Sequence, residues 1–89
     1  MRNQNHPKRG DIRPIQCRLA RVALGWNVDK LASEANVSTQ TIKRLERGEE
    51  LRPATIQKIQ ISMENAGIEF IPPNGGGIGV RFKDPSRVS

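Results

Sequence analysis

Residues 28–47, VDKLASEANVSTQTIKRLER, contain two short helical patterns that are separated by one break. Apolar residues recur at the three- and four-residue spacing of one helix face. Asn27 and Ser38 suit the capping position before each helix, and Asn36 is one of the few residue types besides glycine that tolerates a left-handed conformation. The pattern therefore predicts two helices joined by a tight turn. The face that they bury between them is expected to consist of Leu31, Ala35, Val37, Ile42 and Leu45.

The second of these helices, expected over about residues 38–47, has an outward side that is too polar for a core. Its members are Thr39, Gln40, Lys43, Arg44 and Arg47. A helix fits the major groove of B-DNA, where glutamine pairs with adenine, arginine or lysine pairs with guanine, and a threonine hydroxyl can contact any base. Arg47 has a simpler alternative, which is to stabilise the negative end of the helix dipole.

Two longer helices are expected on either side of this pair. Residues 14–24 begin with a proline, which suits the first helical position, and Gly25 provides a left-handed stop. Residues 53–66 show the same apolar period and end at Gly67. The side chains expected to face the core from these two helices are Cys17, Ala20, Val22, Leu24, Ile56, Ile59 and Met63.

The segments outside residues 14–67 differ in character. Residues 1–13 are basic and lack an apolar period, which predicts a flexible arm that either contacts DNA or has no function of its own. Residues 68–83 hold two short stretches of strand formers around a run of prolines and glycines, which predicts a β-hairpin or two extended arms. Residues 84–89 are expected to fray. The predicted fold class is mainly α, with four to five helices and this C-terminal hairpin or extended arm.

Several short motifs follow one another along the chain. They are Arg18-Leu19-Ala20-Arg21, Gly25-Trp26, Leu31-Ala32, Val37-Ser38-x-x-Thr41-Ile42-x-x-x-Glu46-x-Gly48 and Pro53-Ala54-Thr55-Ile56. In this combination the chain resembles the Xre, or lambda-repressor/Cro-like, family of helix-turn-helix transcriptional regulators. The resemblance covers about residues 13–67. It implies a lambda-repressor-like DNA-binding domain, double-stranded DNA as the partner and no cofactor.

The resemblance also implies roles for single residues. The expected base-contacting residues are Thr39, Gln40, Lys43 and Arg44. The expected phosphate-contacting residues are Asn27, Ser38, Thr41 and Arg21. Arg21 and Glu46 match a pair that ties the first helix to the third, the alternative being an ordinary surface contact. Val28 departs from the family, because many members carry a phosphate-contacting glutamine at that position, so this contact is expected to be lost.

Composition argues against several classes of protein. Fifteen basic residues against nine acidic ones give a net charge of +6, which favours an anionic partner. One cysteine, Cys17, and one histidine, His6, cannot form an internal disulfide or a four-ligand zinc site. No nucleophile has a candidate base, so catalysis is not expected. With so few ligands, no metal is expected either. Cys17 is expected to be a buried packing residue. No apolar stretch approaches the ~20 residues of a membrane span, and the N-terminus lacks a signal-peptide core, so a cytoplasmic protein is expected.

The sequence predicts a dimeric, sequence-specific regulator that binds through its third helix. A second hypothesis is the antitoxin of a toxin–antitoxin pair, which would bind both its operator and a toxin. A third is a protein-interaction module on the same scaffold, which would need an acidic or apolar surface on the third helix. Residues 68–83 are expected to make the homodimer, because they are too apolar for a free tail; alternatively, the hairpin packs on the first and fourth helices of its own chain.

Overall fold

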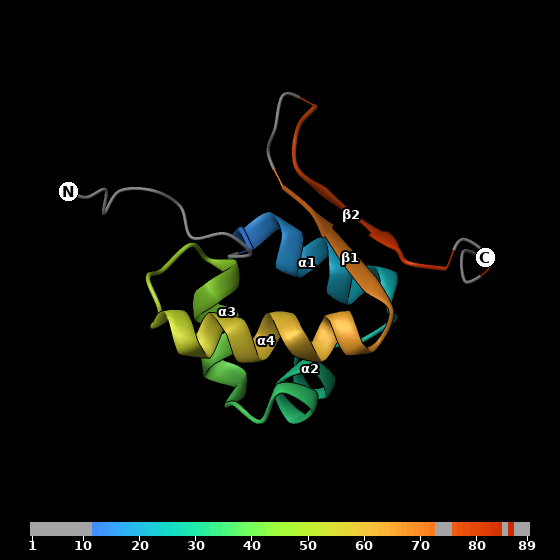
Figure 1. The fold of residues 1–89 in the computed structure, drawn as a ribbon. Coiled ribbons are helices and arrows are strands. Elements are labelled where there is room, and N and C mark those ends of the chain that lie inside the picture. The colour runs from blue at the N-terminus through green and yellow to red at the C-terminus, as the bar shows by residue number, and fades with distance from the viewer. Residues whose placement is uncertain (1–11, 73–75, 85, 87–89) are drawn as a thin grey trace.

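The computed structural model describes residues 12–72, 76–84 and 86, and Figure 1 shows its fold. The elements in chain order are α1 (Pro14–Ala23), α2 (Val28–Ala35), α3 (Thr39–Glu46), α4 (Pro53–Asn65), β1 (Ile68–Ile71) and β2 (Gly79–Phe82). The predicted fold class, mainly α with a C-terminal hairpin, is confirmed. Residues 1–11 of the predicted arm, part of the hairpin loop and most of the predicted frayed tail lie outside the described residues.

Short polar side chains cap the starts of α2 and α3, and Asn36 forms the turn between them. The Oδ1 atom of Asn27 accepts a hydrogen bond of 2.7 Å from the backbone N–H of Lys30, and the Oγ atom of Ser38 accepts one of 3.1 Å from Thr41. Asn36 has a φ of 59° and a ψ of 47°, the left-handed conformation predicted for it. The two caps satisfy backbone donors that the first turn of a helix leaves unpaired. Sequence and structure therefore agree at this turn.

The core lies where the helices meet. α2 contacts both α3 and α4, and α1 contacts α3, so α3 is held along its inner side by two other helices. The segment up to the end of α2 supplies Ile12, Cys17, Ala20, Leu31, Ala32 and Ala35, and the remainder of the buried apolar cluster is Ile42, Leu45, Ile59, Met63 and Ile68.

α1 buries small side chains and exposes large ones. Cys17 and Ala20 are fully buried, whereas Val22, which was predicted to face the core, is 65% exposed and lies in an exposed apolar stripe with Ile15 and Leu19. The prediction for Val22 is wrong because two positions separate it from Ala20. With about 3.6 residues per turn, that spacing places the two side chains on opposite faces of the helix.

The hairpin packs on the helices of its own chain. β2 contacts α1 and β1 contacts α4. Figure 1 shows both strands on the α1 side of the molecule, away from α2. The strands are antiparallel, with Ile68 opposite Phe82 and Ile71 opposite Gly79, and Ile68 is fully buried. The structure thus shows the intrachain packing that the sequence left open, while a dimer through the same segment stays a prediction.

Gln16 attaches the hairpin to α1. Its side chain is almost completely buried, and its Nε2 atom donates to the carbonyl oxygens of Ile71 at 2.9 Å and Gly79 at 3.0 Å. Its Oε1 atom accepts a hydrogen bond of 2.9 Å from the backbone N–H of Arg13. Ile12, which the sequence placed in the arm, is only 5% exposed and belongs to the core. The packed part of the chain therefore includes the last two residues assigned to the arm.

Candidate nucleic-acid interface

α3 has one side in the core and one side in solvent. Ile42 and Leu45 are buried on the inner side, while Gln40, Lys43 and Arg44 are exposed on the outer side. In the part of the chain that the structure describes, Gln40 and Lys43 form no side-chain hydrogen bond or ion pair. Both side chains are therefore free to bind an external group. Thr39, the other predicted base contact, is half-buried at the start of the helix.

The predicted phosphate contacts gather at the N-terminal ends of α2 and α3. Asn27 and Ser38 cap these helices from exposed positions, and the Oγ1 atom of Thr41 lies 2.9 Å from the Oγ atom of Ser38. The first backbone N–H groups of a helix and its dipole favour an anion at this end. The start of α3, with its two hydroxyls, and the start of α2, capped by Asn27, thus each provide groups that suit a phosphate.

Arg21 of α1 and Glu46 of α3 form a two-point ion pair. Their Nε and Oε2 atoms lie 2.8 Å apart, and their Nη2 and Oε1 atoms lie 2.9 Å apart. The Nη1 atom of Arg21 donates to the carbonyl oxygen of Trp26 at 3.3 Å. The Arg21 and Glu46 side chains are only 15% and 13% exposed, so the pair is sheltered and differs from an ordinary surface contact. It joins α1 to the C-terminal end of α3.

Burial and charge act in opposite directions on this pair. Burial raises the pKa of Glu46, but the hydrogen bonds and charge of Arg21 outweigh it and hold that pKa below its usual range. The hydrogen bond to Glu46 raises the pKa of Arg21. Burial, with a further contribution from Glu46, raises the pKa of the Cys17 thiol, whose Sγ atom donates to the Glu46 Oε2 atom at 3.5 Å. A protonated, buried thiol is unreactive, and Cys17 is the packing residue that the sequence predicted.

A second carboxylate holds the two arginines at the C-terminal end of α3. Arg44 donates from Nε to the Oε1 atom of Glu49 at 3.0 Å, and Arg47 donates from Nε and Nη2 to the Oε2 atom at 2.9 and 2.8 Å. The three side chains are 44%, 53% and 45% exposed. The hydrogen bonds from Arg47 and Arg44 lower the pKa of Glu49. The sequence analysis missed Glu49, because the residue lies past the helix end, where no periodic spacing links it to the arginines.

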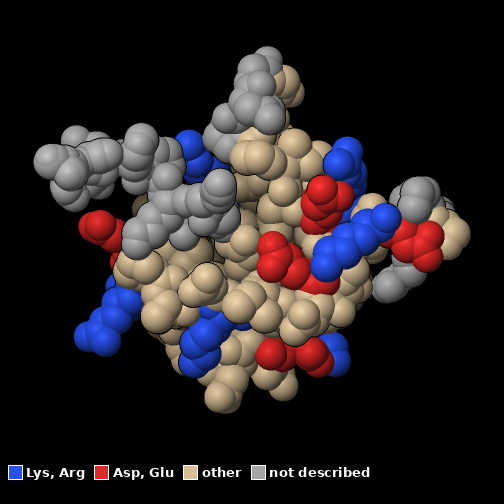
Figure 2. Space-filling model, in the orientation of Figure 1, with Lys and Arg blue, Asp and Glu red and all other residues tan. Residues whose placement is uncertain are grey.

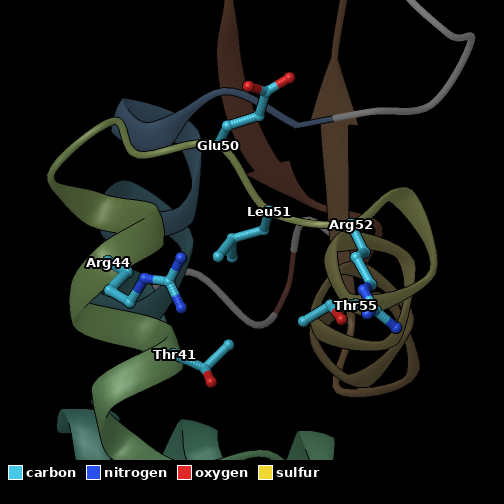
Figure 3. Close-up of a pocket in the computed structure, with 6 residues that line it drawn as sticks. All are labelled: Thr41, Arg44, Glu50, Leu51, Arg52 and Thr55. Carbon is cyan, nitrogen blue, oxygen red and sulfur yellow. The ribbon is translucent and has the colours of Figure 1, made fainter.

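A groove of about 240 Å³ separates α3 from the start of α4. In Figure 3, Thr41 and Arg44 point from α3 into this space, and Arg52 lies beside Thr55 at the start of α4. The carboxylate of Glu50 points away from it. Arginines and hydroxyls are donors that suit a phosphate. The complete lining is Thr41, Arg44, Glu50, Leu51, Arg52 and Thr55.

The face formed by α4 and the hairpin has a different charge pattern. In Figure 2, acidic side chains lie among basic ones across this view. The Nε atom of Arg81 lies 3.0 Å from the Oε1 atom of Glu69, so an ion pair neutralises charge on the hairpin. This view therefore shows no continuous basic surface of the kind that a phosphate backbone attracts.

The described residues provide neither a metal site nor a membrane span. No three side chains among their histidines, cysteines, aspartates and glutamates form a group that could hold a metal ion. None of the described helices combines the length and apolar character required to cross a bilayer.

Comparison with known families agrees with this geometry. Residues 18–60 match a family model described as helix-turn-helix. This range begins within α1, ends within α4 and excludes the hairpin. Together with the arrangement of α1 to α4, the match gives a lambda-repressor-like helix-turn-helix fold and supports DNA binding by this part of the chain. No curated protein matches the sequence.

Proposed function

We propose that this chain is a sequence-specific, double-stranded-DNA-binding transcriptional regulator whose α3 enters the major groove. The observation that carries the proposal is the outer side of α3, where Gln40 and Lys43 are exposed and unpaired among the described residues while Ile42 and Leu45 fix the inner side. An α-helix with its side chains is about 10–12 Å in diameter, which fits a major groove about 12 Å wide.

In this proposal, bases and phosphates are bound by separate groups. Thr39, Gln40, Lys43 and Arg44 contact base edges. Asn27, Ser38, Thr41 and the remaining donors of Arg21 contact phosphates. Arg52 contacts a phosphate from the groove into which Thr41 also points (Figure 3). The Arg21–Glu46 pair joins α1 to α3, so the position of α3 relative to α1 is fixed before DNA binds.

The surface chemistry favours DNA over a protein partner. An interaction module on this scaffold needs an acidic or apolar outer side on α3, and the observed side is neutral to basic. Glutamine and lysine at adjoining exposed positions are side chains that form hydrogen bonds with base edges. This observation supports the regulator in preference to the scaffold hypothesis.

The first test is the selection of bound duplexes from a random DNA pool, followed by alanine substitution. Gln40→Ala and Lys43→Ala should each weaken binding to the selected operator by about 1–3 kcal/mol and leave binding to unrelated duplex nearly unchanged. Gln57→Ala, at an exposed position of α4, is the matched control. If both α3 variants bind the operator as tightly as the parent chain, α3 does not read the sequence.

The proposed regulator acts as a homodimer. A single recognition helix reads only a few base pairs, and helix-turn-helix dimers place two such helices about 34–36 Å apart. The hairpin of residues 68–83 and the neighbouring exposed stripe of Ile15, Leu19 and Val22 provide apolar surface for a second copy. The support for this step is the exposure of the α1 stripe, together with the contact between β2 and α1.

Sedimentation equilibrium tests the dimer. The double variant Leu19→Lys and Val22→Lys should sediment as a monomer and keep its fold, because both side chains are already exposed. Ile61→Lys, at an equally exposed apolar position of α4, should remain a dimer. A double variant that dimerises like the parent chain excludes this surface as the interface.

A further inference from the structure

The arginines of the proposed DNA-binding helix already have an anionic partner within the protein. One carboxylate, that of Glu49, accepts hydrogen bonds from both Arg44 and Arg47. These arginines are two of the three cations on the exposed side of α3, and Lys43 is the third. An anion that binds this end of α3 through the same N–H groups must therefore replace Glu49.

We propose that Glu49 is an intramolecular competitor of DNA, which in the free protein holds Arg44, a proposed base contact, together with Arg47, and lowers the affinity of the protein for DNA. The proposal rests on the proposed function. A carboxylate and a phosphate both accept paired N–H donors from a guanidinium group, so they compete for the same atoms. When DNA binds the two arginines, the released carboxylate of Glu49 lies beside a polyanion and repels it.

The exposure of the cluster makes the exchange possible. All three side chains are close to half exposed, so a phosphate can reach the guanidinium groups and water can solvate the released carboxylate. Pairs of this kind are weak and are screened by salt. The Arg21–Glu46 pair behaves differently, because its two side chains are sheltered and join two helices.

The cluster is not required for the fold of this segment. The backbone N–H of Glu49 donates to the carbonyl oxygen of Arg44 at 3.0 Å, and Gly48, with a φ of 89°, turns the chain. Both features remain when the carboxylate is replaced by an amide. Glu49→Gln therefore removes the competing charge and leaves the backbone in place.

The size of the effect follows from counterion release. Each additional phosphate that the protein neutralises makes the slope of log affinity against log salt steeper by about 0.9. Removing the Glu49 charge frees one net positive charge for phosphate, so the slope should steepen by up to about 0.9. At about 0.1 M salt this corresponds to an affinity about five- to tenfold higher.

The experiment measures binding of the full chain to a short fluorescein-labelled duplex of mixed sequence, by anisotropy, between about 50 and 200 mM salt. Glu49→Gln should bind more tightly and with the steeper slope. Glu34→Gln is the matched control, because it removes the same charge from an ion pair of similar exposure on α2, with Lys30 at 2.9 Å. The control should change the affinity by less than about twofold, since neither Glu34 nor Lys30 is one of the proposed DNA contacts and an exposed pair is weak.

A second pair of variants tests whether Glu49 acts through the arginines. In a chain that carries Arg44→Gln and Arg47→Gln, adding Glu49→Gln should raise the affinity clearly less than it does in the parent chain, because only the repulsion of DNA by the carboxylate is then removed. An equal gain with and without the arginines overturns the competition, because the effect is then one of net charge alone. A weaker affinity for Glu49→Gln than for the parent also overturns it, and shows instead that Glu49 orients the arginines for binding.

The outcomes separate this proposal from the proposed function. A parent chain that binds duplex while Glu49→Gln binds no better contradicts only the competitor role. A parent chain and a Glu49→Gln variant that both fail to bind duplex at any salt concentration contradict the DNA-binding function and the competitor role together.

Discussion

Two glutamates at the C-terminal end of α3, Glu46 within the helix and Glu49 just past it, pair with arginines in different surroundings. On the inner side, Glu46 is sheltered and pairs at two points with Arg21 of another helix. On the outer side, Glu49 is almost half exposed and pairs with arginines from its own helix end. The comparison shows that burial, more than the identity of the pair, separates a contact that maintains the fold from one that a ligand can replace.

The largest expected difference between the two sides is in hydrophobic packing. Ile42→Ala should lower the free energy of unfolding by about 2–5 kcal/mol, because the side chain is fully buried and its loss leaves a cavity. Lys43→Ala, one residue further along and exposed, should stay within about 0.5 kcal/mol of the parent chain. Urea denaturation measures both. Equal losses for the two variants would contradict the assignment of inner and outer sides.

The two carboxylates allow a matched test of the ion pairs. Glu46→Gln should lower the free energy of unfolding by about 1–3 kcal/mol, between the values for exposed and fully buried pairs. A double-mutant cycle with Arg21→Met should assign most of this loss to the interaction between the two side chains. Glu49→Gln should leave the free energy of unfolding unchanged within error. A zero interaction energy between Arg21 and Glu46 would show that their close geometry contributes nothing to stability.

The contribution of Glu46 to the free energy of unfolding should also depend on pH. The pKa of Glu46 is lower in the folded protein than its ordinary value of 4.5, so its stabilisation is fully present above that value and is lost as the pH falls through the folded pKa. The stability difference between the parent chain and Glu46→Gln should therefore be constant near neutral pH and shrink below about pH 4.5. A difference that grows on acidification contradicts the sign of this linkage.

A smaller effect is expected where a polar group is buried on the other side of the molecule. Gln16→Leu should cost about 1–2 kcal/mol, because the carbonyl oxygens of Ile71 and Gly79 lose their donor inside the protein. In Gln16→Leu, hydrogen exchange should become faster than in the parent chain, and the increase should be larger in β1 and β2 than in α2 and α3. Gln57→Leu, at an exposed position, is the control. Hairpin amides that exchange as slowly as in the parent chain would show that Gln16 does not attach the hairpin.

The local elements of this fold could be predicted from the sequence because their signals are short-range. The caps at Asn27 and Ser38 act on N–H groups three residues away, and the left-handed Asn36 is set by its own backbone preference. The helix-turn-helix fold follows from these elements and from the apolar period of α2 and α3.

The features that the sequence did not predict correctly have one physical cause. They depend on contacts between segments that are far apart in the chain. Gln16 looks like a solvated residue in the sequence, and its burial follows from carbonyl groups 55 and 63 residues further along the chain. Val22 was misplaced because α1 has two apolar stripes, and only packing decides that the stripe with the smaller side chains, Cys17 and Ala20, is buried.

The central claim, that the outer side of α3 binds DNA, is tested most directly by an NMR titration of the full chain with its selected operator. The account predicts that the largest changes in amide chemical shift fall on residues 39–44 and at Asn27, with small changes in α4 and the hairpin. Large changes confined to β1, β2 or the exposed side of α4, with the amides of α3 unmoved, would contradict it.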